Sequence, residues 1–260
     1  MKGNIQVEMY LIAGFILSAV MGITLGLIGG GGSTIMVPVL VYVMGIGAHQ
    51  AIGMSLAIVG MTSLAGVGLH YRQGTVKVKT GAFFSISGVV GAYAGSYLTY
   101  LLSPAALLLS FAVLMILVSI AMLFERSDDR DVITHQDQSR LKTLAAGLIV
   151  GLLTGFLGVG GGFLAVPALV FFCGLSMKDA IGTSLLIIAV NCAAGLAGHL
   201  RYGSFDVRIT MLVTIIAISG ACIGTALSHH ISAASLKKWF AALVIAVAIF
   251  LIVKNYKALL

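Results

Sequence analysis

The 260-residue sequence contains 60% hydrophobic and 9% charged residues, carries a formal net charge of +7 and has a mean hydropathy of +1.12. Soluble domains average about 25% charged residues, so this composition excludes a soluble globular domain. Because lipid tolerates only helices or closed barrels, and the alternating pattern of barrel strands is absent, we predict an all-α polytopic membrane protein.

The first predicted segment, Met9–Met44, is longer than the roughly 20 apolar residues that one crossing needs. Four consecutive glycines, Gly29 to Gly32, lie in its middle, and glycine has a low helix propensity. We therefore expect a broken or re-entrant segment whose free amides line a polar cavity. A helix that restarts near Ser33 would present N–H groups and a positive dipole end, which suit an anion. The alternative is that the glycines only allow close helix packing.

The second half of the chain repeats the first at an offset of 129 residues, which places Pro38 on Pro167. The matching segments are GLIGGGGSTIMVPVLVYVMG and GFLGVGGGFLAVPALVFFCG, AIGMSL and AIGTSL, and HYRQG and HLRYG. We expect two tandem homologous repeats, residues 1–124 and 143–260, joined by a cytoplasmic linker, residues 125–142. In a membrane protein such a duplication points to a site between the halves.

The polar residues inside the apolar segments favour an anionic substrate. All eight acidic residues lie at segment borders or in loops, whereas cation transporters usually carry an embedded carboxylate. The candidate donors are glycine-cluster amides, hydroxyls and one amide side chain. The predicted substrate-binding residues are Gly30, Gly31, Gly32, Ser33, Thr34, Ser55, Gly160, Gly161, Gly162, Thr183, Ser184 and Asn191. Each hydroxyl could instead bond to its own helical turn.

Basic residues recur at the end of the third segment of each half, as His70 with Arg72 and His199 with Arg201. They could form an electropositive vestibule that gathers anions. The alternative is that the arginines anchor helix ends at the headgroups. The sequence offers no metal-ligand pattern, so we expect no metal, no cofactor and no catalytic residue.

The distribution of basic residues bears on topology. If each half crosses the membrane a net four times, 12 of the 15 basic residues lie on one side, which the positive-inside rule makes the cytoplasm. If each half instead makes five crossings and is inverted, the best orientation places only ten inside. We therefore expect about eight net crossings with both termini cytoplasmic.

The paired motifs GGGGSTIMVPVL and GVGGGFLAVPAL, each followed by AIGxSL, resemble the TauE/SafE sulfite exporter family along essentially the whole chain. The resemblance implies a cytoplasmic-membrane permease, most simply an exporter, of small sulfur-containing anions such as sulfite or organosulfonates. Thiosulfate-uptake relatives carry a CPxxC motif that this chain lacks. The expected partners are a small anion and the lipid bilayer, without nucleic acid, and a homodimer stays open.

Two other functions stay open on the sequence. One is a non-transporting membrane subunit or receptor. The other is an intramembrane protease, because GGGGS with His70 or His199 resembles a rhomboid-type site. Against a protease, the residue that matches Ser33 in the second half is Gly162.

Overall fold

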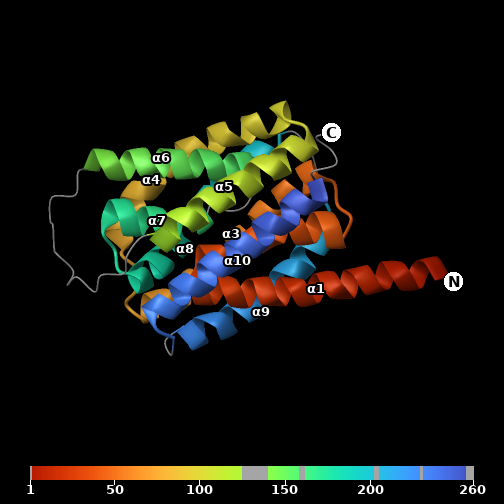
Figure 1. The fold of residues 1–260 in the computed structure, drawn as a ribbon, viewed down its shortest axis with the longest axis horizontal. Helices are drawn as coiled ribbons and strands as arrows, with labels where there is room; N and C mark the ends of the chain where they lie inside the picture. The colour runs from red at the N-terminus through yellow and green to blue at the C-terminus, as the bar shows by residue number, and fades with distance from the viewer. Residues whose placement is uncertain (1, 125–139, 158–161, 202–204, 229–230, 256–260) are drawn as a thin grey trace.

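The computed structural model describes residues 2–124, 140–157, 162–201, 205–228 and 231–255, and in these ranges the chain is helical (Figure 1). The α-helices are α1 Lys2–Ile28, α2 Ser33–Pro38, α3 Ala48–Arg72, α4 Val78–Leu98, α5 Pro104–Phe124, α6 Arg140–Leu157, α7 Gly162–Cys173, α8 Met177–His199, α9 Val207–Ser228 and α10 Ala233–Asn255. Short 3-10 turns at Gly30–Gly32 and Thr99–Leu101 and a π-helical turn at Val39–Val43 connect some of them.

The helices have the length and surface of membrane-spanning segments. Within the described residues, α3, α8 and α9 are each long and apolar enough to cross a bilayer, and several shorter apolar helices accompany them. Large apolar side chains such as Ile16, Ile86 and Ile215 are more than 60% exposed on the outside of the bundle. An exposed apolar exterior is stable only in lipid, so the all-helical membrane fold is confirmed.

Small residues allow two pairs of helices to pack backbone against backbone. A side chain at Gly22 or Gly26 of α1 would meet the backbone of α9, and one at Gly91 or Gly95 of α4 would meet the backbone of α6. These four glycines therefore allow close helix packing. Residue numbers rise together along both pairs, so α1 runs parallel to α9, and α4 runs parallel to α6.

The central helices α3 and α8 occupy matching positions in the two halves, but they run antiparallel. Gly66 of α3 faces Leu185, Gly60 faces Cys192, and Gly195 of α8 faces Leu56. As residue numbers rise on α3, those of their partners on α8 fall. The expectation of about eight net crossings gave both halves the same orientation, so it is wrong on this point. The count assumed that each half crosses the membrane a net four times.

The first segment instead folds back on itself. Gly32 packs against the backbone of Met21 and Leu25, and Gly14 lies against the side chain of Met44. The returning segment, residues 33–43, therefore runs antiparallel along α1, and the two form a hairpin. In the second half the start of α6 meets the end of α7, where Thr143 Oγ1 lies 3.8 Å from Cys173 Sγ. The start of α1 and the end of α10 lie at one end of the bundle, and α5 ends and α6 begins at the other (Figure 1).

Candidate functional site

The predicted break in the first segment is present. Helix α1 ends at Ile28, Gly29 adopts a φ of +71°, and a 3-10 turn precedes the restart of the helix at Ser33. This positive φ favours glycine, and a Cβ at Gly29 would lie 2.8 Å from the hydroxyl of Ser184. The glycine therefore serves both the turn and the close approach of α8. In the second half α6 ends at Leu157 and α7 begins at Gly162, and the predicted site residues Gly160 and Gly161 lie outside the described residues.

The two breaks meet in the interior of the molecule. A Cβ at Gly30 would overlap the backbone of Gly162, and a Cβ at Gly162 would meet both Gly30 and the side chain of Ile188. Residues that lie 132 positions apart in the sequence thus touch through their main chains. The structure brings together Gly30, Gly162 and, through Gly29, Ser184, as expected for a site between the halves. Gly31 and Gly32 belong to the same turn.

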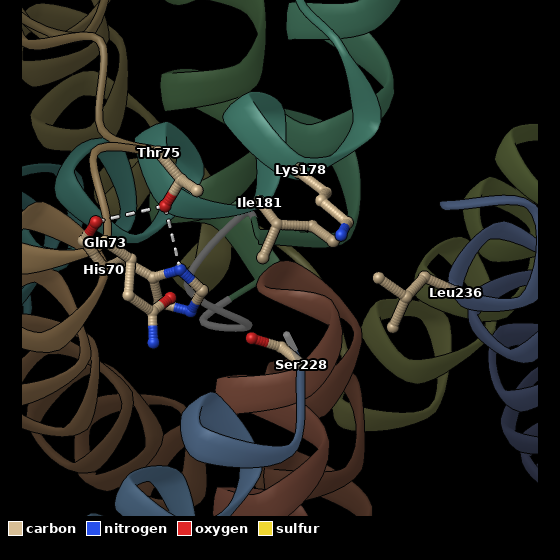
Figure 2. A pocket seen from close by; sticks show the side chains of 7 residues that line it. All are labelled: His70, Gln73, Thr75, Lys178, Ile181, Ser228 and Leu236. Carbon is tan, nitrogen blue, oxygen red and sulfur yellow. Dashed lines mark hydrogen bonds between the residues drawn. The ribbon is translucent and has the colours of Figure 1, made fainter. Parts of the chain in front are cut away.

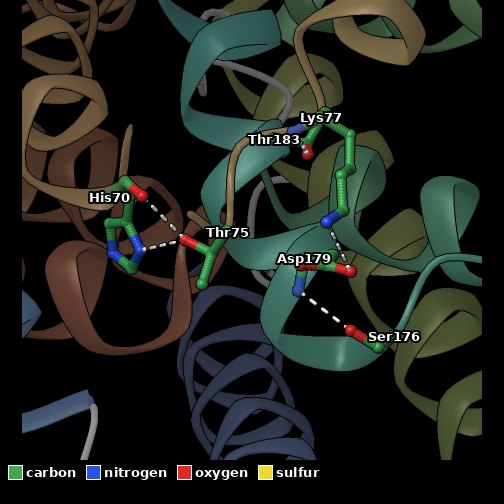
Figure 3. A network of polar contacts seen from close by, with 6 residues as sticks. All are labelled: His70, Thr75, Lys77, Ser176, Asp179 and Thr183. Atoms are coloured by element: carbon green, nitrogen blue, oxygen red, sulfur yellow. Dashed lines mark hydrogen bonds and ion pairs between the residues drawn. The ribbon is translucent and has the colours of Figure 1, made fainter. Parts of the chain in front are cut away.

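Three of the predicted hydroxyls already have hydrogen-bond partners in the structure. The Ser33 hydroxyl donates to Gly30 O at 2.7 Å, and the Ser184 hydroxyl donates to Ile181 O at 2.8 Å. Both are bonds to the preceding turn. The hydroxyl of Thr183 instead accepts from the backbone N–H of Lys77 at 2.9 Å and holds the loop before α4 (Figure 3). All three hydroxyl oxygens can still accept a hydrogen bond, but the protons of Ser33 and Ser184 are already donated to main-chain carbonyls.

Four other buried polar side chains have no hydrogen-bond partner among the described residues: Ser55, Ser63, Ser85 and Asn191. Both amide atoms of Asn191 are unpaired although the residue is fully buried. Its amide packs against Gly88 of α4, where a Cβ would lie 2.5 Å from Oδ1. An unpaired buried amide costs free energy, so it is a group whose retention calls for a ligand or a water. Ser55 and Asn191 were both predicted site residues, and Thr34 is also buried.

The two predicted histidines make matching contacts. His70 Nε2 lies 3.1 Å from Gly26 O, and His199 Nε2 lies 3.0 Å from Gly155 O. Both carbonyls belong to the last turn of a helix that ends at a glycine cluster, where main-chain acceptors lack helical partners. Each imidazole therefore donates to a carbonyl just before a break. The histidines hold the ends of α1 and α6 in place.

The second ring nitrogens differ. His70 Nδ1 lies 3.1 Å from Thr75 Oγ1, whereas His199 Nδ1 lies 3.1 Å from the hydroxyl of Tyr100. The Tyr100 ring also stacks on His49 with a centroid distance of 5.4 Å. The matching histidines thus have different surroundings.

The arginines of the predicted vestibule do not join the histidines. Arg72 is exposed at the end of α3, and Arg201 is exposed with its guanidinium carbon 5.6 Å from the centroid of the Tyr93 ring. This position suits an anchor at the membrane surface. The cation beside a histidine is instead Lys178, which the sequence did not single out.

A cavity of about 260 Å³, including its open mouth, lies between the ends of four helices (Figure 2). It is lined by Lys178, His70, Gln73, Thr75, Ser228, Ile181 and Leu236. We call it the Lys178 cavity. In Figure 2 the Lys178 side chain extends from α8 on the same rim as Ile181, and Leu236 lies on the far side. The cavity joins residues from α3, α8, α9 and α10, so no local sequence pattern marks it.

The described residues contain no cluster of three or more His, Cys, Asp or Glu side chains that could hold a metal ion. Cys173 and Cys192 are buried and Cys222 is exposed, all three as free thiols.

A bundle of apolar helices with an apolar exterior, in which the first helix break contacts the start of α7, is typical of a multi-pass membrane protein. The sulfite exporter TauE/SafE family model matches residues 14–251. The chain belongs to this family, a family of transporters and not of enzymes.

Curated relatives of the chain are likewise described as probable membrane transporters. The chain is 36% identical over 243 residues to a probable membrane transporter protein of Xylella fastidiosa strain 9a5c, covering 92% of this chain and 93% of that protein. It is 30% identical over 215 residues to the probable membrane transporter protein YdhB of Bacillus subtilis, covering 78% and 84%. It is also 26% identical over 237 residues to the probable membrane transporter protein MJ0441 of Methanocaldococcus jannaschii, covering 85% and 86%. No solved structure matches the chain.

Proposed function

We propose that this transporter exports small sulfur-containing anions, such as sulfite or organosulfonates, across the cytoplasmic membrane. The observation that carries the proposal is the contact of the first helix break with the start of α7, at Gly30 and Gly162. The unpartnered buried donors Ser55 and Asn191 lie on α3 and α8, two helices that pack against these segments. Moving helices apart at this contact would expose main-chain amides to a substrate. Main-chain N–H groups and neutral side-chain donors bind an anion with charge-assisted hydrogen bonds.

The sign of the substrate follows from what surrounds the breaks. Within the described residues the only ion pair joins Lys77 and Asp179, at 3.4 Å near the ends of helices (Figure 3). In the part of the chain that the structure describes, no acidic residue is among the buried polar side chains. A cation would therefore have no counter-charge in the interior, whereas an anion would meet donors.

The proposal includes two inverted halves, residues 1–124 and 143–260, joined by the linker of residues 125–142. The antiparallel register of α3 and α8 supports inversion, and each half then has a hairpin and three crossing helices. We call the end of the bundle where α5 ends and α6 begins the linker side, and the opposite end the terminal side. The loops on the linker side carry ten of the 15 basic residues, so it is the cytoplasmic side. Both termini then lie outside, in place of the cytoplasmic termini that eight crossings require.

The energy for export can come from the membrane potential. An inside-negative potential of 100 mV favours the exit of a monoanion by about 2.3 kcal/mol. The chain can therefore export without a nucleotide.

The test is sulfite flux in proteoliposomes. Purified protein is reconstituted, the vesicles are loaded with sulfite or sulfoacetate, and efflux is followed while a potassium gradient with valinomycin sets the potential. We expect anion efflux that increases with an inside-negative potential. Efflux no faster than from protein-free vesicles for every sulfur anion, with or without a potential, would overturn the proposal.

A further inference from the structure

The Lys178 cavity has the charge and chemistry of an anion site. Lys178 is its cation, and Gln73, Thr75 and Ser228 add polar groups, while its seven described lining residues include no carboxylate. The nearest acidic residue in sequence, Asp179, is held in an ion pair with Lys77 at 3.4 Å (Figure 3). The charge of Lys178 therefore lacks a carboxylate partner within the described residues. Such an unbalanced cation on a concave surface raises the local concentration of anions.

The Lys178 cavity adjoins the first helix break. Ile181 lines the cavity, and its backbone oxygen lies 3.2 Å from the position of a Cβ at Gly29. His70 lines the same cavity and bonds to Gly26 O in the last turn of α1. Ile181 and His70 therefore connect the cavity to the end of α1 and the first break.

The matching place in the other half has a different chemistry. At the offset of 129 residues Lys178 corresponds to His49, and Ser228 corresponds to Thr99. There His49 stacks on the Tyr100 ring at 5.4 Å, and the Tyr100 hydroxyl bonds to His199 at 3.1 Å. An aromatic ring and two imidazoles take the place of the lysine, so the cationic cavity belongs to the linker side.

We propose that the Lys178 cavity is the entry site for the transported anion on the linker side, where a small oxyanion binds to Lys178 before it reaches the helix breaks. This inference rests on the proposed function. Lys178 holds the anion by charge, and the neighbouring hydroxyls and amide replace part of its water shell. The enclosed part of the cavity has room for about one water molecule, so the anion binds to Lys178 at the open mouth.

Transport kinetics of Lys178→Gln test the entry site. In sulfite-loaded proteoliposomes we expect the KM at the linker side to rise about tenfold with kcat within about twofold of the wild type, as for the loss of one charge-assisted contact. Lys178→Arg should restore the KM, and the matched control Lys79→Gln, an exposed lysine at the start of α4, should leave it unchanged. An unchanged KM in Lys178→Gln with normal wild-type flux would overturn the entry site and leave the proposed function standing.

Cysteine labelling tests the site even where the wild type moves no sulfite. In a variant without Cys173, Cys192 and Cys222, Ser228→Cys places a thiol in the cavity. We expect the anionic reagent sulfonatoethyl methanethiosulfonate to react faster than its trimethylammonium counterpart, with the preference falling about tenfold in Lys178→Gln. Ethanesulfonate should slow the anionic reaction. Equal rates for the two reagents, or a preference that survives Lys178→Gln, would contradict an anion site here.

Discussion

The two helix ends that are held by histidines share the histidine-to-carbonyl contact and differ in the side chains beside each histidine. His70 and His199 each bond to a glycine carbonyl one turn before a break, at 3.1 and 3.0 Å. Beside His70 lies a cavity that is lined by Lys178. Beside His199 lies Tyr100, whose ring centroid is 5.5 Å from that of His199 and 5.4 Å from that of His49. The same histidine-to-carbonyl contact therefore has different neighbouring side chains at the two helix ends.

This difference has a mechanical meaning for a transporter. Alternating access needs one approach to be open while the other is closed. The structure is consistent with an approach on the linker side through the Lys178 cavity and a closed approach at Tyr100. The break contact at Gly30 and Gly162 lies between them.

The topology of the two halves gives the largest expected effect, because its outcome is all or none. Reporters fused after Lys79 and after Arg130 should report the cytoplasm, and reporters fused near Arg208 and at the C-terminus should report the outside. Alkaline phosphatase and fluorescent-protein fusions measure this directly. The same location for the Lys79 and Arg208 fusions would mean parallel halves and would remove the structural basis of the comparison.

The backbone contact of the breaks should be almost as sensitive. Gly30→Ala adds a Cβ that overlaps Gly162, so we expect sulfite efflux to fall at least about tenfold through misplaced breaks. The matched control is Gly68→Ala on α3, where a Cβ meets nothing within 4 Å. Efflux is measured on variants that elute as a single species after purification. Efflux of Gly30→Ala equal to that of Gly68→Ala would reduce the contact to ordinary packing.

The closed approach should open when its aromatic ring is removed. Tyr100→Ala leaves a void between His49 and His199 and removes a hydrogen bond, so we expect about 3 kcal/mol of lost stability and an increased leak of anions. Tyr100→Phe removes only the hydroxyl and should cost about 1 kcal/mol. Thermal unfolding and passive efflux without a potential measure the two effects. A Tyr100→Ala variant with the stability of the wild type and no increase in passive anion efflux would show that the Tyr100 ring does not close this approach.

The unpaired amide of Asn191 gives the smallest but most specific effect. Asn191→Leu replaces an unsatisfied buried group with an apolar one, so we expect it to leave the free protein unchanged or more stable by about 1 kcal/mol. If the amide contacts the substrate, the same change should weaken anion binding by about 1–3 kcal/mol. Ser119→Ala on α5 is the control, since the buried Ser119 hydroxyl already donates to Met115 O and lies outside the candidate site. Calorimetry with sulfite and thermal unfolding separate the two effects, and unaltered binding in Asn191→Leu would remove this residue from the site.

The sequence predicts those parts of the structure that depend on local chemistry. Four glycines in a row break a helix wherever they stand, so the interruption after Ile28 was predictable. The pairing of Gly22 and Gly26 with another helix was also predictable from their spacing, because small residues four apart form a flat strip.

The orientation of the halves and the identity of the cavity residues depend on tertiary structure. Loop charges gave the wrong relative orientation because the segment after Ser33 returns along α1 and does not cross. Lys178 was overlooked because it lies beside Asp179 at a helix start, where a solvated lysine is ordinary. One signal was available: the repeat places Lys178 on His49, just before the shared sequence AIG.

The most direct test of the difference between the two ends is the accessibility of a matched pair of cysteines, Ser228→Cys beside Lys178 and Thr99→Cys beside Tyr100. In the variant without native cysteines, each is treated in sealed vesicles with the anionic methanethiosulfonate from one side at a time. We expect rapid labelling of Ser228→Cys from the linker side and no labelling of Thr99→Cys from the terminal side until Tyr100→Ala is added. Equal labelling of the two cysteines from their respective sides, with Tyr100 in place, would contradict the account.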